Sequence, residues 1–173
     1  MTNWPADAIL VLLETTPAGE LAASAPGLLG AAAAVGTPIG LLVASDADAP
    51  AAQAAELGAA AVLVAEPVDG LTVPVVDALQ AAAELVQPDA VLLPHSIEGR
   101  DVAGRFAART RSGVCVDAIG VARDDEGVIA HHSVYGGAYD TTSSVTWGAP
   151  VITVRQGAVQ ERAEAQPLAL ERL

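Results

Sequence analysis

Residues 95–113, HSIEGRDVAGRFAARTRSG, decide the fold because an apolar strand leads here into a polar, arginine-rich helix. The preceding residues 90–94, AVLLP, have the composition of a short buried strand. Ser96 is a good N-cap for a helix over residues 97–109, because its side-chain oxygen accepts a hydrogen bond from a free amide of the first turn. The stretch therefore predicts one strand-helix unit.

The predicted helix has two different faces. Val102 and Phe106 are four residues apart, so they share an apolar stripe that faces a core. Asp101 and Arg105 lie on the opposite stripe with the acid-before-base spacing that stabilises a helix by a few tenths of a kcal/mol. The helix is therefore expected to pack on a sheet through one face only.

Arg100 does not fit this scheme. A cation in the first turn of a helix opposes the helix dipole, at a cost of about 0.3–1 kcal/mol. Two interpretations stay open: an anion lies close to Arg100, or the side chain is solvated or paired with Glu98.

The chain before this stretch alternates strand and helix. Continuous apolar runs typical of strands buried on both faces occur at residues 8–13, 39–44 and 61–65, and helical patterns occur at residues 15–35, 50–57 and 72–87. Four such units predict an α/β fold, a three-layer Rossmann-like parallel sheet with helices on both faces. Ligands of such sheets bind at the carboxyl ends of the strands, here around residues 14–19, 45–48 and 95–100.

The pattern changes after Gly113. Apolar and β-branched runs separated by turn residues occur at 114–121, 128–135, 139–147 and 151–155. They predict a β-rich C-terminal part, with one or two parallel strands that complete the sheet and an antiparallel excursion between them. The α/β domain is expected to occupy residues 1–158. Residues 159–173 have no companion core and are expected to be a linker or an arm toward another domain.

The charge is distributed unevenly. Residues 1–99 contain twelve Asp and Glu and no Lys or Arg, net −12, and residues 100–173 contain nine acids and eight arginines, net −1. An acidic body of this kind argues against nucleic-acid and anionic-membrane binding. The uncharged stretch 21–45 is broken by prolines and glycines, so no membrane insertion is expected. Without a basic n-region at the start of the chain, the expected location is the cytoplasm.

Residue patterns for chemistry are few. The first strand-helix turn, ETTPAGE, lacks the glycines of a dinucleotide-binding loop, and a chain without lysine has no P-loop. His131 and His132 are adjacent on a predicted strand, so they point to opposite faces and do not readily share a metal ion. His95 has no evident catalytic partners, and Cys115 between two valines is expected to be a small buried side chain. We predict no catalytic residue and no metal site.

Several longer pieces carry a resemblance to a family. They are PHSIEGRDVAGRFAARTRSG at 94–113, Asp117 in VCVDAIGV, VYGGAY at 134–139, GAPVITVRQGA at 148–158, and the opening VLLETTPAGEL at 11–21. In this order and spacing the chain resembles the α subunit of electron transfer flavoproteins. The resemblance covers only the family's N-terminal α/β domain. The C-terminal domain, which carries most of the FAD-binding residues, has no counterpart after Leu173.

The resemblance implies a heterodimer with a β subunit of related fold, which holds AMP in many members. The complex would carry electrons from flavin dehydrogenases to a quinone reductase or a similar acceptor. This domain would be a scaffold without redox activity of its own, and no cofactor is expected in it. Removal of a large partner domain would expose apolar surface, so the fragment is expected to self-associate or to bind its β subunit.

Six residues match positions common in the family and are interface candidates: Arg100, Arg105, Tyr135, Gly136, Gly137 and Arg155. The chain departs from many members around the tyrosine loop, where it has His132 and Ser133 before the loop and Ala138 after its glycines. Another class of function stays open, an adenine-nucleotide-binding α/β module in which the helix start at Arg100 receives a phosphate.

Overall fold

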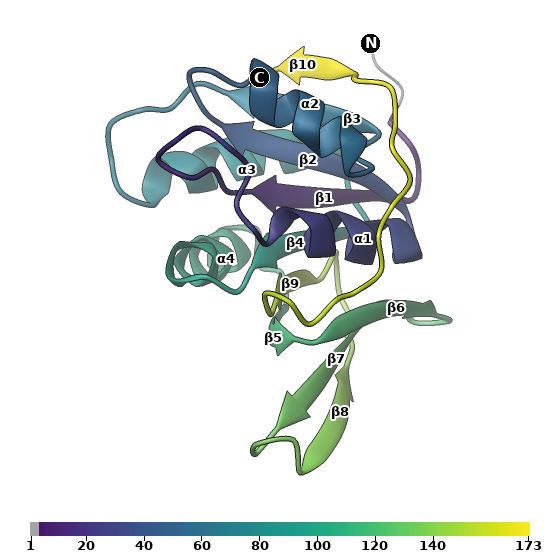
Figure 1. Cartoon of the computed structure of the whole chain (residues 1–173). Coiled ribbons are helices and arrows are strands. Elements are labelled where there is room, and N and C mark those ends of the chain that lie inside the picture. The colour runs from purple at the N-terminus through teal and green to yellow at the C-terminus, as the bar shows by residue number, and fades with distance from the viewer. Residues whose placement is uncertain (1–3) are drawn as a thin grey trace.

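The computed structural model describes residues 4–173 (Figure 1). Its helices are α1 (Ala25–Val35), α2 (Asp48–Glu56), α3 (Val73–Val86) and α4 (Ile97–Thr110). Its strands are β1 (Ala8–Leu13), β2 (Thr37–Val43), β3 (Ala61–Ala65), β4 (Ala90–Pro94), β5 (Val114–Ala118), β6 (Gly120–Asp124), β7 (Gly127–Val134), β8 (Tyr139–Ser143), β9 (Val151–Val154) and β10 (Leu170–Arg172).

Seven of these strands form one sheet in the order β10-β3-β2-β1-β4-β9-β5. Every neighbouring pair in it is parallel. The central strand β1 is buried along its whole length, as its continuous apolar sequence predicts for a strand with helices on both sides. The predicted three-layer α/β fold is therefore confirmed.

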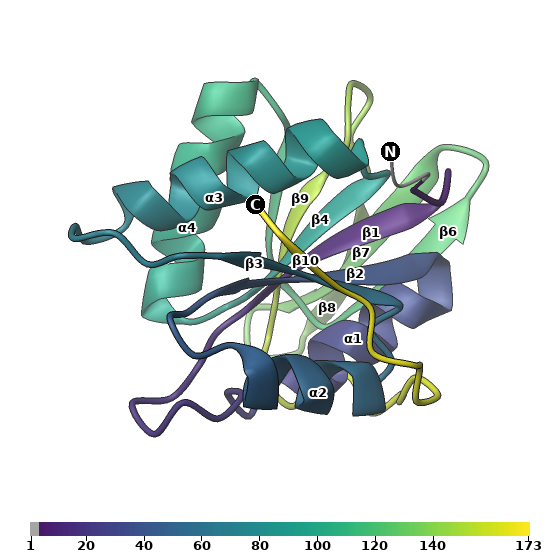
Figure 2. The ribbon, with the colours of Figure 1, turned by 90° about the horizontal axis from the view of Figure 1, so that it is seen from above.

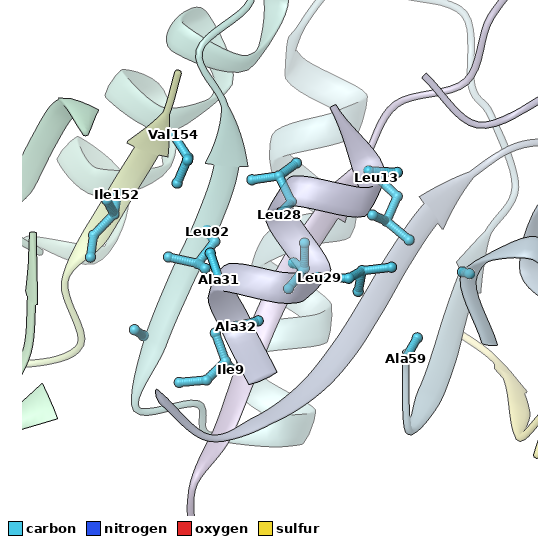
Figure 3. Close-up of a cluster of buried hydrophobic side chains, with 14 of the residues drawn as sticks. Ile9, Leu13, Leu28, Leu29, Ala31, Ala32, Ala59, Leu92, Ile152 and Val154 are labelled. Atoms are coloured by element: carbon cyan, nitrogen blue, oxygen red, sulfur yellow. The ribbon is translucent and has the colours of Figure 1, made fainter. Parts of the chain in front are cut away.

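The helices divide between the two faces of the sheet (Figure 2). Alternate residues of β1 point to opposite faces, so Ile9, Val11 and Leu13 join α1 and α2 in one core cluster. Leu10 and Leu12 join α3 and α4 in the other. Figure 3 shows the first cluster, with the α1 side chains lying against the sheet. The sheet therefore lies between two separate apolar cores.

The first helix begins later than its sequence pattern suggests. The expected helix start at residue 15 is wrong, because α1 begins at Ala25 with Pro26 in its first turn. Proline has no amide hydrogen and is favoured at this position, so it marks the beginning of the helix rather than a flaw within it. Residues 14–24 form an irregular loop closed by a hydrogen bond from the Thr16 amide to the Glu20 carbonyl oxygen at 2.8 Å.

The antiparallel excursion predicted after residue 113 is a separate three-stranded sheet, β6-β7-β8. Successive hairpins connect its strands, with β6 antiparallel to β7 and β7 antiparallel to β8. Figure 1 shows the β7-β8 hairpin extending away from the parallel sheet. We call β6, β7 and β8 the protruding sheet. The two remaining strands of this region, β5 and β9, complete the parallel sheet as predicted.

Residues 159–173 lie along the domain itself. Val159 is buried in the core with α1, and β10 adds a parallel strand to the edge at β3. A Cβ atom built on Gly30 would lie 2.1 Å from the Glu161 carbonyl oxygen, so only glycine lets the segment pass this close to α1. The expectation that this segment has no core to pack against is therefore wrong, because Val159 is buried in the core and β10 pairs with β3. The division at residue 158 and a linker role stay predictions.

Within residues 4–173, no helix combines the length and the apolar character needed to cross a bilayer. Cys115 is buried and unpaired, as the sequence predicts. Burial raises the pKa of its thiol, so the side chain is a poor nucleophile.

Candidate functional site

Polar side chains gather where the parallel strands end. Glu14 follows β1, His95 follows β4 and Arg155 follows β9. Asp117 lies near the end of the neighbouring edge strand β5. Carboxyl ends of parallel strands share one edge of the sheet, so these groups line the region where α/β proteins place their ligands.

Asp117 and Arg155 form a two-point ion pair. Arg155 Nε donates to Asp117 Oδ1 at 2.9 Å, and a terminal nitrogen of Arg155 donates to Asp117 Oδ2 at 2.7 Å. These hydrogen bonds are the main reason that the pKa of Asp117 lies below its ordinary value. The planar guanidinium matches the carboxylate in both distance and direction, so the pair fixes orientation as well as charge.

A β-bulge aims Asp117 at this arginine. Along β5 the register moves from Cys115 opposite Ile152 to Ala118 opposite Val154, which leaves one extra residue on β5. Asp117 absorbs it with a left-handed backbone, φ 59°. Aspartate tolerates this conformation better than most side chains. The bulge thus turns the carboxylate toward the residue that follows β9.

Thr153 connects the ion pair to His95. Its side chain is fully buried, and its hydroxyl accepts the Asp117 amide at 3.0 Å while lying 2.9 Å from His95 Nδ1. If Thr153 donates its own hydrogen to Nδ1, neutral His95 carries its proton on Nε2, which is 3.6 Å from Asp117 Oδ1. The network therefore ties the ends of β4, β9 and β5 together.

The same network reaches the protruding sheet. Arg155 also donates to the Ser133 carbonyl oxygen at 3.4 Å, near the end of β7. His132, the preceding residue of that strand, is buried. Asp117 and Arg155 thus lie at the junction between the parallel and protruding sheets.

The far end of the protruding sheet is aromatic and exposed. Tyr135 is 85% exposed and meets Tyr139 edge-to-face, with ring centroids 5.9 Å apart. Trp147 is 82% exposed as well, but it lies in the segment that leads from β8 back to β9, at the base of the sheet. Tyr135, Gly136 and Gly137 all have positive φ angles, so they form the left-handed turn between β7 and β8. Tyrosine and tryptophan are favoured at protein interfaces, because each supplies a large contact area with a polar edge.

Two candidate arginines lie elsewhere, on α4. Arg100 Nε donates to the Ser96 carbonyl oxygen of its own helix at 3.0 Å, and Arg105 Nε donates to Asp101 Oδ1 at 3.0 Å. The i,i+4 pair is as the spacing predicts. Figure 1 shows α4 beside the parallel sheet and the β7-β8 turn at the far end of the protruding sheet. The structure therefore brings Arg155 close to the strand that leads to the tyrosine turn, but it does not bring Arg100 or Arg105 there.

A cleft of about 460 Å³ opens at the carboxyl end of β1, beside the starts of α3 and α4. Glu14 lines it and accepts a hydrogen bond from Ser96 Oγ at 2.5 Å. Burial raises the pKa of Glu14, and the nearby charge of Glu98 raises it further. The hydrogen bond from Ser96 lowers the pKa but does not cancel the effect of burial. Ser96 in turn accepts the Gly99 amide at 2.8 Å, as expected of the helix N-cap.

The strand-helix pattern placed Glu14 in the expected ligand region at residues 14–19, but residue patterns alone did not identify Asp117 or Thr153 as site residues. Asp117 and Arg155 are far apart in the sequence, and no local pattern indicates their contact. The sequence does give one signal for Thr153. It is a polar residue inside the buried run VITV, where its hydroxyl needs a hydrogen-bond partner.

Comparison with known proteins identifies the family. The model of the electron transfer flavoprotein domain matches residues 9–172. The chain belongs to this electron transfer flavoprotein family. The chain is 44% identical over 72 residues to the electron transfer flavoprotein subunit alpha of Mycobacterium tuberculosis, in two strains. It is 44% identical over 70 residues to that of Mycobacterium leprae. These matches cover 42% and 40% of this chain, and 20% of the length of each relative.

Neither the cleft at β1 nor the small cavity beside Arg155 suits a phosphate-bearing ligand. No basic side chain is among the residues that line the cleft at β1, whereas Glu14 and Glu98 are. The cavity beside Arg155 and Arg162 has about 30 Å³, room for about one water molecule. Within residues 4–173, no three His, Cys, Asp or Glu side chains gather as a metal site would require. We therefore assign no cofactor-binding residue to either of these two sites.

Proposed function

We propose that this chain is the N-terminal scaffold domain of an electron transfer flavoprotein α subunit, which pairs with a β subunit through the protruding sheet. The observation that carries the proposal is the exposed aromatic end of that sheet, joined to the parallel sheet by the Asp117–Arg155 pair. Large exposed aromatic side chains on a firmly held element suit a permanent partner, since little conformational entropy is lost on binding.

In this proposal the domain carries no electrons itself. FAD is held mainly by a further domain, AMP by the β subunit, and the assembled complex passes electrons from flavin dehydrogenases to a quinone reductase or a similar acceptor. The chain's contribution is mechanical: its protruding sheet holds the β subunit and leaves the flavin domain free to move. Cytoplasmic location stays part of the proposal.

The interface candidates divide into two groups. Tyr135, Gly136 and Gly137 form the turn that would contact the β subunit, and Arg155 holds the base of the sheet. Arg100 and Arg105 lie on another surface, where they would meet acidic groups of a different domain. Arg105 is engaged with Asp101, so Arg100 has the freer guanidinium for such a contact.

A titration with a cognate β subunit tests the proposal. Wild-type chain is expected to bind, and Tyr139→Ser with Trp147→Ser is expected to weaken binding by about a hundredfold, as loss of aromatic anchors does. The control is Leu71→Ser, which changes an exposed apolar side chain on the loop before α3. Equal loss in both variants, or no binding of the wild type, would contradict the proposal.

The alternative, an adenine-nucleotide-binding module, has less support. A phosphate at the start of α4 would lie near the carboxylate of Glu98 as well as the guanidinium of Arg100. A titration with AMP and ATP separates the two functions. Micromolar affinity that Arg100→Ala abolishes would replace the scaffold proposal with the nucleotide one.

A further inference from the structure

The cleft at the carboxyl end of β1 has no part in the proposed pairing. It lies where the chain leaves neighbouring strands in opposite directions, from β1 to α1 on one face and from β4 to α4 on the other. Crevices of this kind are the usual ligand sites of open parallel sheets. At about 460 Å³ it has the size of a small-molecule site.

The walls of the cleft are apolar and its charges are all of one sign. Leu12, Val43, Val75 and Val102 supply aliphatic surface from four different elements. Glu14 and Glu98 supply two carboxylates, and no arginine or histidine is among the lining residues that the structure describes. This lining suits a ligand with a hydrocarbon body and a positive charge.

Glu14 is held in place for such a role. Ser96 Oγ fixes one of its oxygens at 2.5 Å, and Ser96 is itself fixed by the Gly99 amide at the start of α4. The pKa of Glu14 is raised, mainly by burial. The neighbouring hydrogen bonds therefore offset only part of the cost of removing the ionised carboxylate from water. A cation entering the cleft would supply the missing opposite charge in a partly desolvated place, where ion pairs are stronger than at the surface.

We propose that this cleft binds a small organic cation, an ammonium or guanidinium group on a short hydrocarbon body, with Glu14 as the main anionic partner and Glu98 as the second. The aliphatic walls take the hydrocarbon. The two carboxylates exclude phosphates and carboxylates, which gives the site its selectivity.

The experiment is a titration of the whole chain with n-pentylamine and n-butylguanidine, followed by amide chemical shifts in nuclear magnetic resonance. Saturable binding is expected, with shifts concentrated at residues 12–15, 70–72 and 98–102. The neutral control n-pentanol has a similar hydrocarbon body, and its binding is expected to be weaker by about tenfold or more, because it lacks the charge-assisted hydrogen bond.

Matched variants assign the contact. Glu14→Gln is expected to weaken n-pentylamine binding by about tenfold or more, and Glu98→Gln by a smaller factor. Glu20→Gln changes an exposed acid on the same loop and is expected to leave affinity unchanged. Circular dichroism checks that each variant is folded.

Three results would overturn the proposal: no saturable binding of either cation, equal binding of n-pentanol, or unchanged affinity in both Glu14→Gln and Glu98→Gln. Each is measured on the chain alone, without a β subunit. The result of this experiment is therefore independent of whether the chain pairs with a β subunit.

Discussion

Arg155 holds Asp117 by two parallel hydrogen bonds, and this contact joins the two sheets of the domain. Arg155 follows β9 of the parallel sheet, and it also donates to Ser133 on β7 of the protruding sheet. Asp117 occupies the bulge from which the chain continues into β6. This pair therefore helps to orient the protruding sheet, together with the contacts of Arg123 on β6 with the Val35 carbonyl oxygen and Asp89.

Removal of the Asp117 charge is expected to loosen the base of the protruding sheet. Asp117→Asn keeps the left-handed backbone and the volume but loses the ion pair. Both side chains of the pair are about two-fifths exposed, so the expected fall in melting temperature is modest, about 2–4 °C. Faster amide exchange is expected in β7. Asp125→Asn, an exposed acid in the β6-β7 turn, serves as the control, and an equal fall in both variants would show that the pair has no special role.

The same pair predicts a pH dependence. The pKa of Asp117 in the folded chain lies below its ordinary 3.8, so the ionised form is favoured by folding. Its contribution to stability is full above that ordinary value and is lost as the pH falls through the lower folded-state pKa. The difference in unfolding free energy between wild type and Asp117→Asn is therefore expected to stay constant near neutral pH and to shrink in acid. A difference that grows in acid would contradict this assignment.

Glu14 is expected to act with the opposite sign. Burial raises its folded-state pKa above the ordinary 4.5, so ionisation opposes folding. The contribution of protonated Glu14 to the free energy of unfolding is full below the ordinary pKa, and it is lost as the pH rises through the raised pKa. Glu14→Gln is therefore expected to make the chain more stable than wild type near neutral pH, with the gain vanishing in acid. Denaturant unfolding at several pH values measures this, and a destabilised Glu14→Gln at neutral pH would argue against it.

Two helix glycines provide a matched test of the close contact between α1 and residues 159–173. Gly104→Ala, on the exposed face of α4 with nothing near its Cβ position, is expected to stabilise the chain by about 0.5–1 kcal/mol. Gly30→Ala would place a methyl group 2.1 Å from the Glu161 carbonyl oxygen and is expected to cost about 1–3 kcal/mol. Chemical denaturation compares them. Equal stabilisation in both would mean that the segment does not press on α1 in solution.

Tyr135 separates binding from stability. Its backbone is left-handed, φ 52°, which costs a tyrosine about 1–2 kcal/mol and a glycine little. Tyr135→Gly relieves this strain but loses the contact with Tyr139, worth about 0.5–1.5 kcal/mol. Unfolding free energy is therefore expected to change by less than about 1 kcal/mol. Affinity for a β subunit is expected to fall clearly, and an unchanged affinity would remove Tyr135 from the proposed interface.

Local sequence patterns predicted the parallel core well. The helix expected at residues 97–109 is Ile97–Thr110, because its N-cap, its apolar spacing and its ion pair all lie within a few residues of one another. The strand expected at residues 61–65 is β3 with the same bounds. These elements depend on contiguous residues, so the sequence displays them directly.

Long-range contacts explain what the patterns missed. The edge strand β10 has the sequence LER, which indicates no strand by itself, and it forms by pairing with β3 and by the contact of Arg172 with Glu66. The Asp117–Arg155 pair arises from a bulge between strands, which no spacing rule encodes. Glu14 lines the cleft only because β1 ends at the same edge of the sheet at which α4 begins.

Hydrogen–deuterium exchange of the chain with and without a cognate β subunit tests the central claim most directly. If the protruding sheet is the docking element, the β subunit should protect amides of residues 127–147, while α2 and β10 on the opposite edge of the parallel sheet keep their exchange rates. Protection confined to the starts of α3 and α4, or no protection in the protruding sheet, would contradict the account.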